Sequence, residues 1–149
     1  MSMAAHPALP QIVHFFEQLK AEDVARLGEF YSVTSYFKDP FNDVDSLVDM
    51  QQIFAHMFEQ LDAPRFVVRS AFGEGEQALL IWDFHFRRKG ETQERRIHGS
   101  SHLRFDAQGL VCYHRDYWDT AEELYEHLPL LGAVLRFLKR KLSATPTRT

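Results

Sequence analysis

The chain has 149 residues and a net charge of −4, and it contains 13 Phe, 5 Tyr and 2 Trp. This length suits one domain, and so many aromatic residues indicate a ring-rich core, a ligand cavity or a subunit interface. The five basic residues after Glu126 leave residues 1–126 with a charge of −9. Such an acidic body argues against binding of duplex nucleic acid.

The cysteine content and the N-terminal sequence set expectations for the compartment. Cys112 is the one cysteine, which excludes an internal disulfide. No stretch has the pattern of a signal peptide or the length of a membrane span. We therefore expect a cytoplasmic protein with a single domain over residues 8–142, and with loose ends at 1–7 and 143–149.

The N-terminal residues have helical spacing. Pro10 suits a first helical turn, and Phe15 and Phe16 belong to the apolar positions that follow it. Asp23 is a candidate N-cap of a second short helix that extends to Phe30. Two N-terminal helices are therefore predicted.

A short strand and a third helix follow. The strand is predicted over residues 32–37, before the turn-forming pair Asp39-Pro40. The helix begins near Ser46, carries Phe54 and Phe58 in its apolar stripe, and is expected to end at Pro64.

The hydrophobic period changes from helical to alternating after Pro64. Four strands are predicted, joined by turns: 65–72, 76–88, 94–105 and 110–118. Thr120 and Glu123 form a capping box for a closing helix, which Pro129 restarts. This order predicts an α+β domain with helices gathered on one face of a curved antiparallel sheet.

The two long strands each have an apolar face and a polar face. Trp82, Phe84 and Phe86 share one parity of 76–88, and Ser101 lies on the small, apolar parity of 94–105. His98 and His102 lie on the polar parity, and four residues along a strand span about 13 Å. One metal ion cannot bind both, so we expect no metal site.

The stretch from Gly109 to Asp119 carries the most chemistry. His114, Asp116 and Trp118 alternate along a predicted strand and share one face, which Cys112 joins. Apolar residues occur on both faces of this strand. The pattern therefore leaves open whether the imidazole and the carboxylate point into a cavity or to the surface.

The order of elements over residues 8–119 resembles the nuclear-transport-factor-2-like superfamily, which includes ketosteroid isomerases and SnoaL-like polyketide cyclases. The segment Gly-Leu-Val-Cys-Tyr-His-Arg-Asp resembles the last strand of that family. The resemblance implies a conical α+β barrel with an apolar cavity, His114, Asp116 and Trp118 on the cavity side, and a homodimer through the outer sheet face.

The resemblance also assigns roles to individual positions. Asp39 matches the general base of the isomerases, but Phe15 and Ser101 occupy the positions of their two oxyanion donors, each worth about 3 kcal/mol. Ketosteroid isomerase activity is therefore not expected. Asp116 matches the acid/base aspartate of the cyclases.

These observations lead to a functional hypothesis. We expect a cofactor-free isomerase, cyclase or dehydratase that acts on a small hydrophobic carbonyl compound, with Asp116 as acid or base, His114 as its partner and Asp39 as a second carboxylate. The expected substrate contacts are Phe15, Tyr36, Phe54, Phe58, Trp82, Phe84, Phe86, Ser101 and Trp118. The alternatives are a non-catalytic carrier of a hydrophobic ligand and a dimerisation module.

The C-terminal helix is basic on one side and apolar on the other. Its leucines follow helical spacing, and Arg136, Lys139 and Arg140 lie elsewhere on the helix. This pattern is typical of a helix packed on the domain or of a weak contact with a membrane surface.

Overall fold

The computed structural model describes residues 3–120 and 129–142, in two compact units, Met1–Tyr117 and Trp118–Thr149. The first unit contains α1 (Leu9–Glu17), the 3₁₀ helix η1 (Ala21–Glu29), β1 (Tyr31–Lys38), β2 (Asp43–Val44), α2 (Leu47–Gln60), β3 (Leu61–Glu74), β4 (Gln77–Arg88), β5 (Arg95–Phe105) and β6 (Val111–Tyr117). The second unit contains α4 (Pro129–Leu142). The prediction of one domain over 8–142 stays a prediction.

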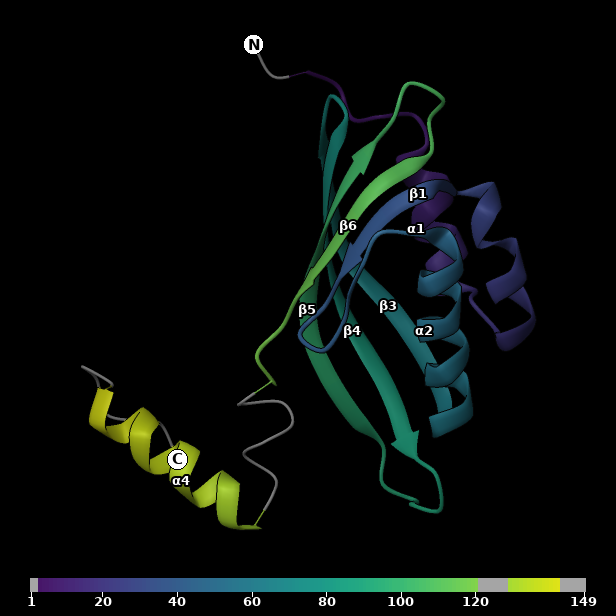
Figure 1. Cartoon of the computed structure of the whole chain (residues 1–149). Helices are drawn as coiled ribbons and strands as arrows, with labels where there is room; N and C mark the ends of the chain where they lie inside the picture. Colours follow the sequence, from purple (N-terminus) through teal and green to yellow (C-terminus); the bar gives the residue numbers. More distant parts are fainter. Residues whose placement is uncertain (1–2, 121–128, 143–149) are drawn as a thin grey trace. The chain divides into compact units, whose positions relative to one another are not determined.

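The six strands form one curved, unclosed sheet in the order β2-β1-β6-β5-β4-β3, with α1 and α2 against one face (Figure 1). The strands β3, β4, β5 and β6 form the expected antiparallel meander. β1 pairs with β6 in parallel, and so an early strand lies beside the last one in the sheet. The predicted α+β class with helices on one face of a curved sheet is confirmed.

The helices begin largely as their sequences predict. Pro10 lies in the first turn of α1, and the Ser46 hydroxyl accepts a hydrogen bond from the Asp49 amide at the start of α2. In η1, however, the N-cap is Lys20, and Asp23 accepts from the Lys20 amide instead of capping the helix itself. The prediction of Asp23 as N-cap is therefore wrong by one turn.

The end of α2 also differs from the expectation. The helix ends at Gln60 and β3 begins at Leu61, so that Pro64 lies within the strand and not at a helix end. The pairing of β3 with β4 shifts between Asp62 and Arg65, and Ala63 has a φ of 50°. Because proline cannot donate to the ladder, it is tolerated at this irregularity.

The core lies between the inner sheet face and the helices. The predicted apolar parity of β4 is buried, as is the parity of β5 that carries Ser101. On the other parity Asp83 is also buried, because Arg69 and His98 cover it. The strand faces predicted from alternation are thus confirmed for both long strands.

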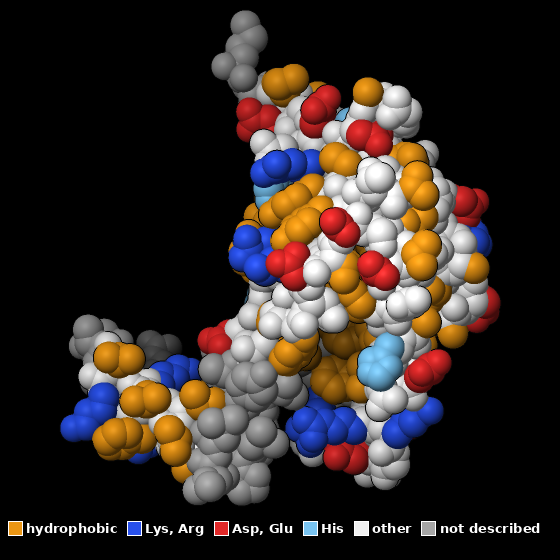
Figure 2. Space-filling view, in the orientation of Figure 1, with side chains coloured by type: hydrophobic (Ala, Val, Ile, Leu, Met, Phe, Trp, Pro, Cys, Tyr) orange, Lys and Arg blue, Asp and Glu red, His pale blue; other side chains and the backbone are white. Residues whose placement is uncertain are grey.

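The α4 helix has hydrophobic and Lys or Arg side chains on the face seen in Figure 2. No helix among the described residues is both long enough and apolar enough to cross a membrane.

Candidate functional site

A chain of hydrogen bonds across four strands forms the centre of the candidate site. The Tyr31 Oη atom lies 2.7 Å from Nδ1 of His114, and Nε2 of His114 lies 2.6 Å from Oδ1 of Asp116. The Ser101 hydroxyl donates to the same Oδ1 over 2.5 Å, and the Trp82 indole donates to Ser101 Oγ over 2.8 Å. His114 and Asp116 therefore meet on the inner side of the sheet.

The position of each proton in this network follows from the acceptor that it faces. Burial, and then the Asp116 carboxylate, raise the pKa of the Tyr31 phenol well above its usual range, so Tyr31 keeps its proton and donates to His114 Nδ1. The imidazole then carries its own proton on Nε2 and donates it to Asp116. Oδ2 of Asp116 has no hydrogen bond to the residues that the structure describes.

The imidazole of His114 is enclosed by rings. It is 3% exposed, and its ring centroid lies 4.9 Å from that of Phe37 and 5.9 Å from those of Phe16 and Tyr31. The Asp116 side chain is 16% exposed. The network therefore runs from a dry interior to a carboxylate that solvent reaches.

Gly99 makes room for the Trp82 indole. The two residues are paired across β4 and β5, and a Cβ atom added at Gly99 would lie 2.5 Å from Cη2 of Trp82. Without that atom the indole lies flat over the strand and reaches Ser101 Oγ, two residues further along β5. Ser101 is in turn paired with Asp116 across β5 and β6.

The network borders a small apolar cavity of about 20 Å³. This volume holds about one water molecule. The residues that line the cavity are Phe16, Phe54, Phe66, Val68, Leu80, Trp82, Ser101, His114 and Asp116. A larger group enters the cavity itself only if the aromatic side chains move.

Some of the predicted contact residues line this cavity and others do not. Trp82, Ser101 and Phe54 line it together with His114 and Asp116. Phe84 and Phe86 are buried and stack on each other at 5.3 Å, as part of the core beyond the cavity. Phe58, Phe15, Tyr36 and Asp39 are not among its lining residues either.

Asp39 holds the loop between β1 and β2. Its Oδ1 atom accepts hydrogen bonds from the amides of Phe41 and Asn42, both over 2.7 Å, and its two carboxylate oxygens accept from the Asn42 side chain. The structure does not bring this carboxylate to the cavity, and its hydrogen bonds are those of a turn former.

Tyr36 and Trp118 lie in other surroundings. The Tyr36 ring stacks on Tyr113 at 5.4 Å, and hydrogen bonding to Asp43, together with partial burial, raises the pKa of its phenol. Trp118 belongs to the second unit, so its expected contact with the substrate stays a prediction.

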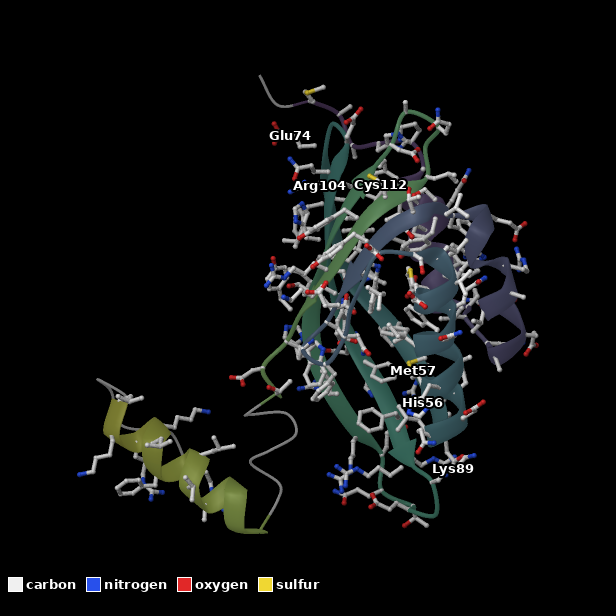
Figure 3. All side chains as sticks on the ribbon, viewed as in Figure 1. His56, Met57, Glu74, Lys89, Arg104 and Cys112 are labelled. Carbon is white, nitrogen blue, oxygen red and sulfur yellow. The ribbon has the colours of Figure 1, made fainter. Side chains whose placement is uncertain are left out.

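Cys112 does not share the face of His114. The pairing of β5 with β6 shifts between Arg104 and Phe105, so that Val111 and His114 are both buried although three residues separate them. The Cys112 thiol lies 3.5 Å from the Arg104 carbonyl oxygen, and both residues are labelled at the same end of the sheet in Figure 3. The expectation that Cys112 joins the inward pair is therefore wrong.

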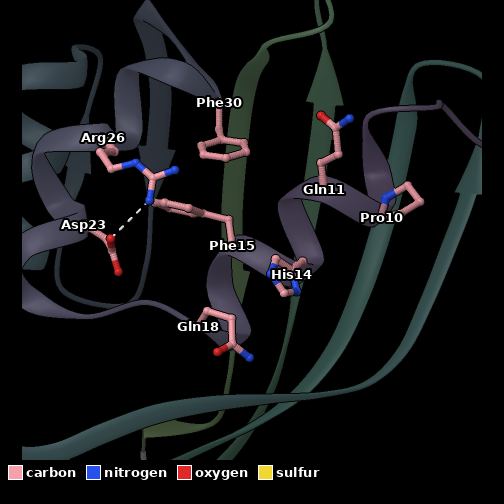
Figure 4. Close-up of a pocket in the computed structure, with 8 residues that line it drawn as sticks. All are labelled: Pro10, Gln11, His14, Phe15, Gln18, Asp23, Arg26 and Phe30. Carbon is pink, nitrogen blue, oxygen red and sulfur yellow. Dashed lines mark hydrogen bonds and ion pairs between the residues drawn. The ribbon is translucent and has the colours of Figure 1, made fainter.

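Phe15 lines a separate groove between α1 and η1. Its ring lies 4.3 Å from that of Phe30, and Arg26, which pairs with Asp23, borders the same groove (Figure 4). The residue that faces the sheet is Phe16, its neighbour. The helical turn of about 100° per residue separates the two rings.

Several site residues were not assigned to the site from the sequence. Phe16, Phe66, Val68 and Leu80 line the cavity. The sequence pattern that could identify them is alternation in the strands and helical spacing in α1. Such a pattern indicates a buried residue, but it does not distinguish a core residue from one that lines a cavity.

The outer histidines have polar partners rather than a metal geometry. His98 Nδ1 lies 2.7 Å from Asp83, His102 Nε2 lies 2.8 Å from Gln77, and His85 Nδ1 lies 3.1 Å from Glu94. Within the described residues, no group of three His, Cys, Asp or Glu side chains is arranged to hold a metal ion.

Solved structures share this fold at low sequence identity. An LEH-like epoxide hydrolase from M. tuberculosis is 14% identical, with a TM-score of 0.68 over 90% of this chain and 97% of that one. A candidate SnoaL-like polyketide cyclase from Shewanella denitrificans OS-217 is 19% identical, with a TM-score of 0.65 over 79% and 97% of the two chains. A protein with a ketosteroid isomerase-like fold from Catenulispora acidiphila DSM 44928 is 10% identical, with a TM-score of 0.68 over 81% and 92%.

No curated protein is similar to the chain at a significant level. A family model, the SnoaL-like domain, matches residues 12–114. The match includes α1 from Ile12, the whole of η1, α2, β3, β4 and β5, and β6 as far as His114. The chain therefore belongs to the SnoaL-like domain family.

Proposed function

We propose that this protein is a cofactor-free acid–base catalyst that isomerises, cyclises or dehydrates a small hydrophobic carbonyl compound. The observation that carries the proposal is the carboxylate of Asp116, whose Oδ1 atom is fixed by His114 and Ser101, while Oδ2 has no hydrogen bond within the described part of the chain. A base held in this way, at the border of an apolar cavity, needs little reorganisation to take a proton.

The network gives each residue a role in this proposal. Asp116 Oδ2 removes a proton from the carbon beside the carbonyl. The proton returns to another carbon in an isomerisation, to the departing hydroxyl group in a dehydration, and, in a cyclisation, to the oxygen of the second carbonyl group that the enolate carbon attacks. His114 orients Asp116 instead of donating to the substrate, because its Nε2–H group donates to the Asp116 carboxylate and its Nδ1 atom accepts from Tyr31. Asp39 is occupied by its turn and takes no part in this proposal.

The donors of the cavity limit the substrate class. The Ser101 hydroxyl and the Trp82 indole both donate their hydrogen bonds within the network, so neither is left to donate to a substrate. An enolate formed here therefore receives little help from the protein, and a site without such donors loses about 3 kcal/mol for each one. The fitting substrates are conjugated carbonyl compounds that spread the negative charge over their own atoms.

The size of the cavity limits how the substrate approaches. About 20 Å³ admits a group no larger than water, while Asp116 is partly exposed. The reacting carbon approaches the carboxylate from the solvent side, and the apolar remainder of the molecule packs against rings at the cavity border.

Proton exchange tests the proposal without knowledge of the substrate. The probe is the conjugated ketone cyclopent-2-enone in D₂O, and NMR follows the replacement of its CH₂ hydrogens by deuterium. Asp116→Asn keeps the shape and removes the base, so exchange falls to the buffer rate, while the exposed control Asp45→Asn exchanges like the wild type. Equal exchange by the wild type and Asp116→Asn overturns the assignment of the base.

A second role, homodimerisation through the outer sheet face, has its own support. Phe72 and Leu79 are paired across β3 and β4, and they are 58% and 40% exposed. An adjacent apolar pair of this kind on a sheet is typical of an interface. Sedimentation velocity should show a dimer that Leu79→Glu converts to a monomer, and a monomeric wild type removes this role.

A further inference from the structure

The α4 helix separates its exposed apolar side chains from three of its four basic side chains. At about 100° per residue, Val134, Phe137, Leu138 and Leu142 fall on one side of the helix. Within the second unit these four side chains are 49%, 50%, 47% and 85% exposed, respectively. So much exposed apolar surface on one helix favours a partner that covers it.

The charge of the helix selects the kind of partner. Arg136, Lys139 and Arg140 lie on the side opposite to Leu138, and the sequence has no acidic residue after Glu126. Lys141 lies on the apolar side, at an angle between Phe137 and Leu138, with its Nζ atom 5.7 Å from the centroid of the Phe137 ring. Cations that flank an apolar stripe allow the stripe to enter a lipid layer while the charges meet its headgroups.

The length of the helix determines how it can bind a membrane. Its 14 residues extend about 21 Å, which is shorter than the hydrocarbon core of a bilayer. The helix therefore lies in the plane of the surface. A nucleic acid would satisfy the charges but leave Phe137 and Leu138 uncovered, whereas a lipid surface covers both kinds of side chain.

We propose that α4 binds the surface of membranes that contain anionic lipid, with Phe137 and Leu138 in the headgroup region and the basic side chains on lipid phosphates and carboxylates. The residues of the first unit carry a net charge of −5, so the same surface repels that unit. The proposal is independent of the chemistry assigned to Asp116.

Co-sedimentation of the full chain with vesicles tests this surface. The vesicles contain phosphatidylcholine with about 30% phosphatidylserine, or phosphatidylcholine alone, at about 0.05 M and about 0.5 M salt. The wild type is expected to bind the anionic vesicles at low salt, to bind the neutral ones much more weakly, and to leave the anionic vesicles as salt rises.

Two variants and one matched control separate the contributions. Removing three charges, by Arg136→Gln, Lys139→Gln and Arg140→Gln, should weaken binding about a hundredfold, since each surface cation contributes about fivefold. Phe137→Ser should weaken it about tenfold. The control removes three exposed cations of the first unit, Lys20, Lys89 and Arg96, by the same change to Gln and should bind like the wild type.

Three outcomes overturn the proposal. These are the absence of binding to anionic vesicles at low salt, equal binding by the α4 charge variant and the first-unit control, and binding that neither salt nor lipid charge alters. Capture of α4 by the acidic first unit or by an acidic protein produces the first of these outcomes. Thermal unfolding of each variant verifies that the first unit stays folded.

Discussion

The phenol of Tyr31 and the imidazole of His114 lie 2.7 Å apart, although 83 positions separate them in the sequence. Both are nearly fully buried, at 1% and 3% exposure. Because Tyr31 retains its proton, this contact sets the tautomer in which His114 donates to Asp116. A residue at the start of β1 thus fixes the geometry at the end of β6.

Tyr31→Phe should lower the free energy of unfolding by about 1–3 kcal/mol, because it leaves Nδ1 of His114 buried without a donor. Urea denaturation measures this loss. The matched control is Tyr117→Phe, on a 46% exposed ring, which should change stability by less than about 0.5 kcal/mol. Equal effects of the two substitutions would show that the Tyr31 contact contributes nothing.

Two serine substitutions should have opposite signs. Ser35 is fully buried and its hydroxyl has no hydrogen-bond partner among the described residues, so Ser35→Ala should leave stability unchanged or raise it by about 1 kcal/mol. Ser101→Ala should lower it by about 1–3 kcal/mol, since Trp82 loses its acceptor and Asp116 a donor. The midpoints of urea unfolding measure both changes in stability. If Ser35→Ala destabilises the protein as much as Ser101→Ala, the difference expected between the two hydroxyls is contradicted.

Gly99→Ala should displace the Trp82 indole, since the new Cβ would lie 2.5 Å from it, and should cost about 1–3 kcal/mol of stability. Tryptophan fluorescence reports the displacement when Trp118→Phe removes the other indole. In a Trp82→Phe background the same glycine substitution should cost less, because the smaller ring leaves room. If Gly99→Ala destabilises the wild type and the Trp82→Phe variant equally, the strain does not come from contact with the Trp82 indole.

Asp83→Asn tests an outer-face ion pair through pH. Hydrogen bonding to His98, and then to Arg69, lowers the pKa of the Asp83 carboxyl in the folded chain. A carboxyl with a lowered folded pKa stabilises the fold above its unfolded pKa, about 3.9, and this contribution disappears as the pH falls through the folded value.

The wild type should therefore be more stable than Asp83→Asn at pH 7, by up to about 1 kcal/mol because His98 and Arg69 are more than half exposed. The difference should shrink as the pH falls below about 4. Urea unfolding at pH 7 and below about pH 4 measures this difference in stability, and Asp45→Asn, at an exposed position, is the control. A difference that stays constant with pH would exclude the charge as its source.

Much of the fold could be predicted from the sequence because local patterns carry it. The alternation of Trp82, Phe84 and Phe86 identified the inner face of β4, and the Ser46 cap marked the start of α2. The end of α2 was less readable, since Pro64 is accommodated by an irregular pairing that depends on the neighbouring strand.

The candidate site was predictable in part, since Trp82, Ser101 and Phe54 were expected there and line the cavity with His114 and Asp116. His114 and Asp116 were identified as a pair, but their partners Tyr31, Ser101 and Trp82 lie on three other strands. The resemblance to the family places Phe15 at the site, but Phe16 lines the cavity. Spacing along the helix does not say which of two adjacent rings meets the sheet.

By itself the sequence determined the kinds and order of the elements other than the two-residue strand β2, and it placed a histidine two residues before an aspartate on the last strand. Only the tertiary structure decided that this pair points inward while Cys112 does not. The physical reason is the side-chain period of two, because one extra residue in the β6 pairing reverses the face of every residue before it. That shift arises between strands, where no local pattern records it.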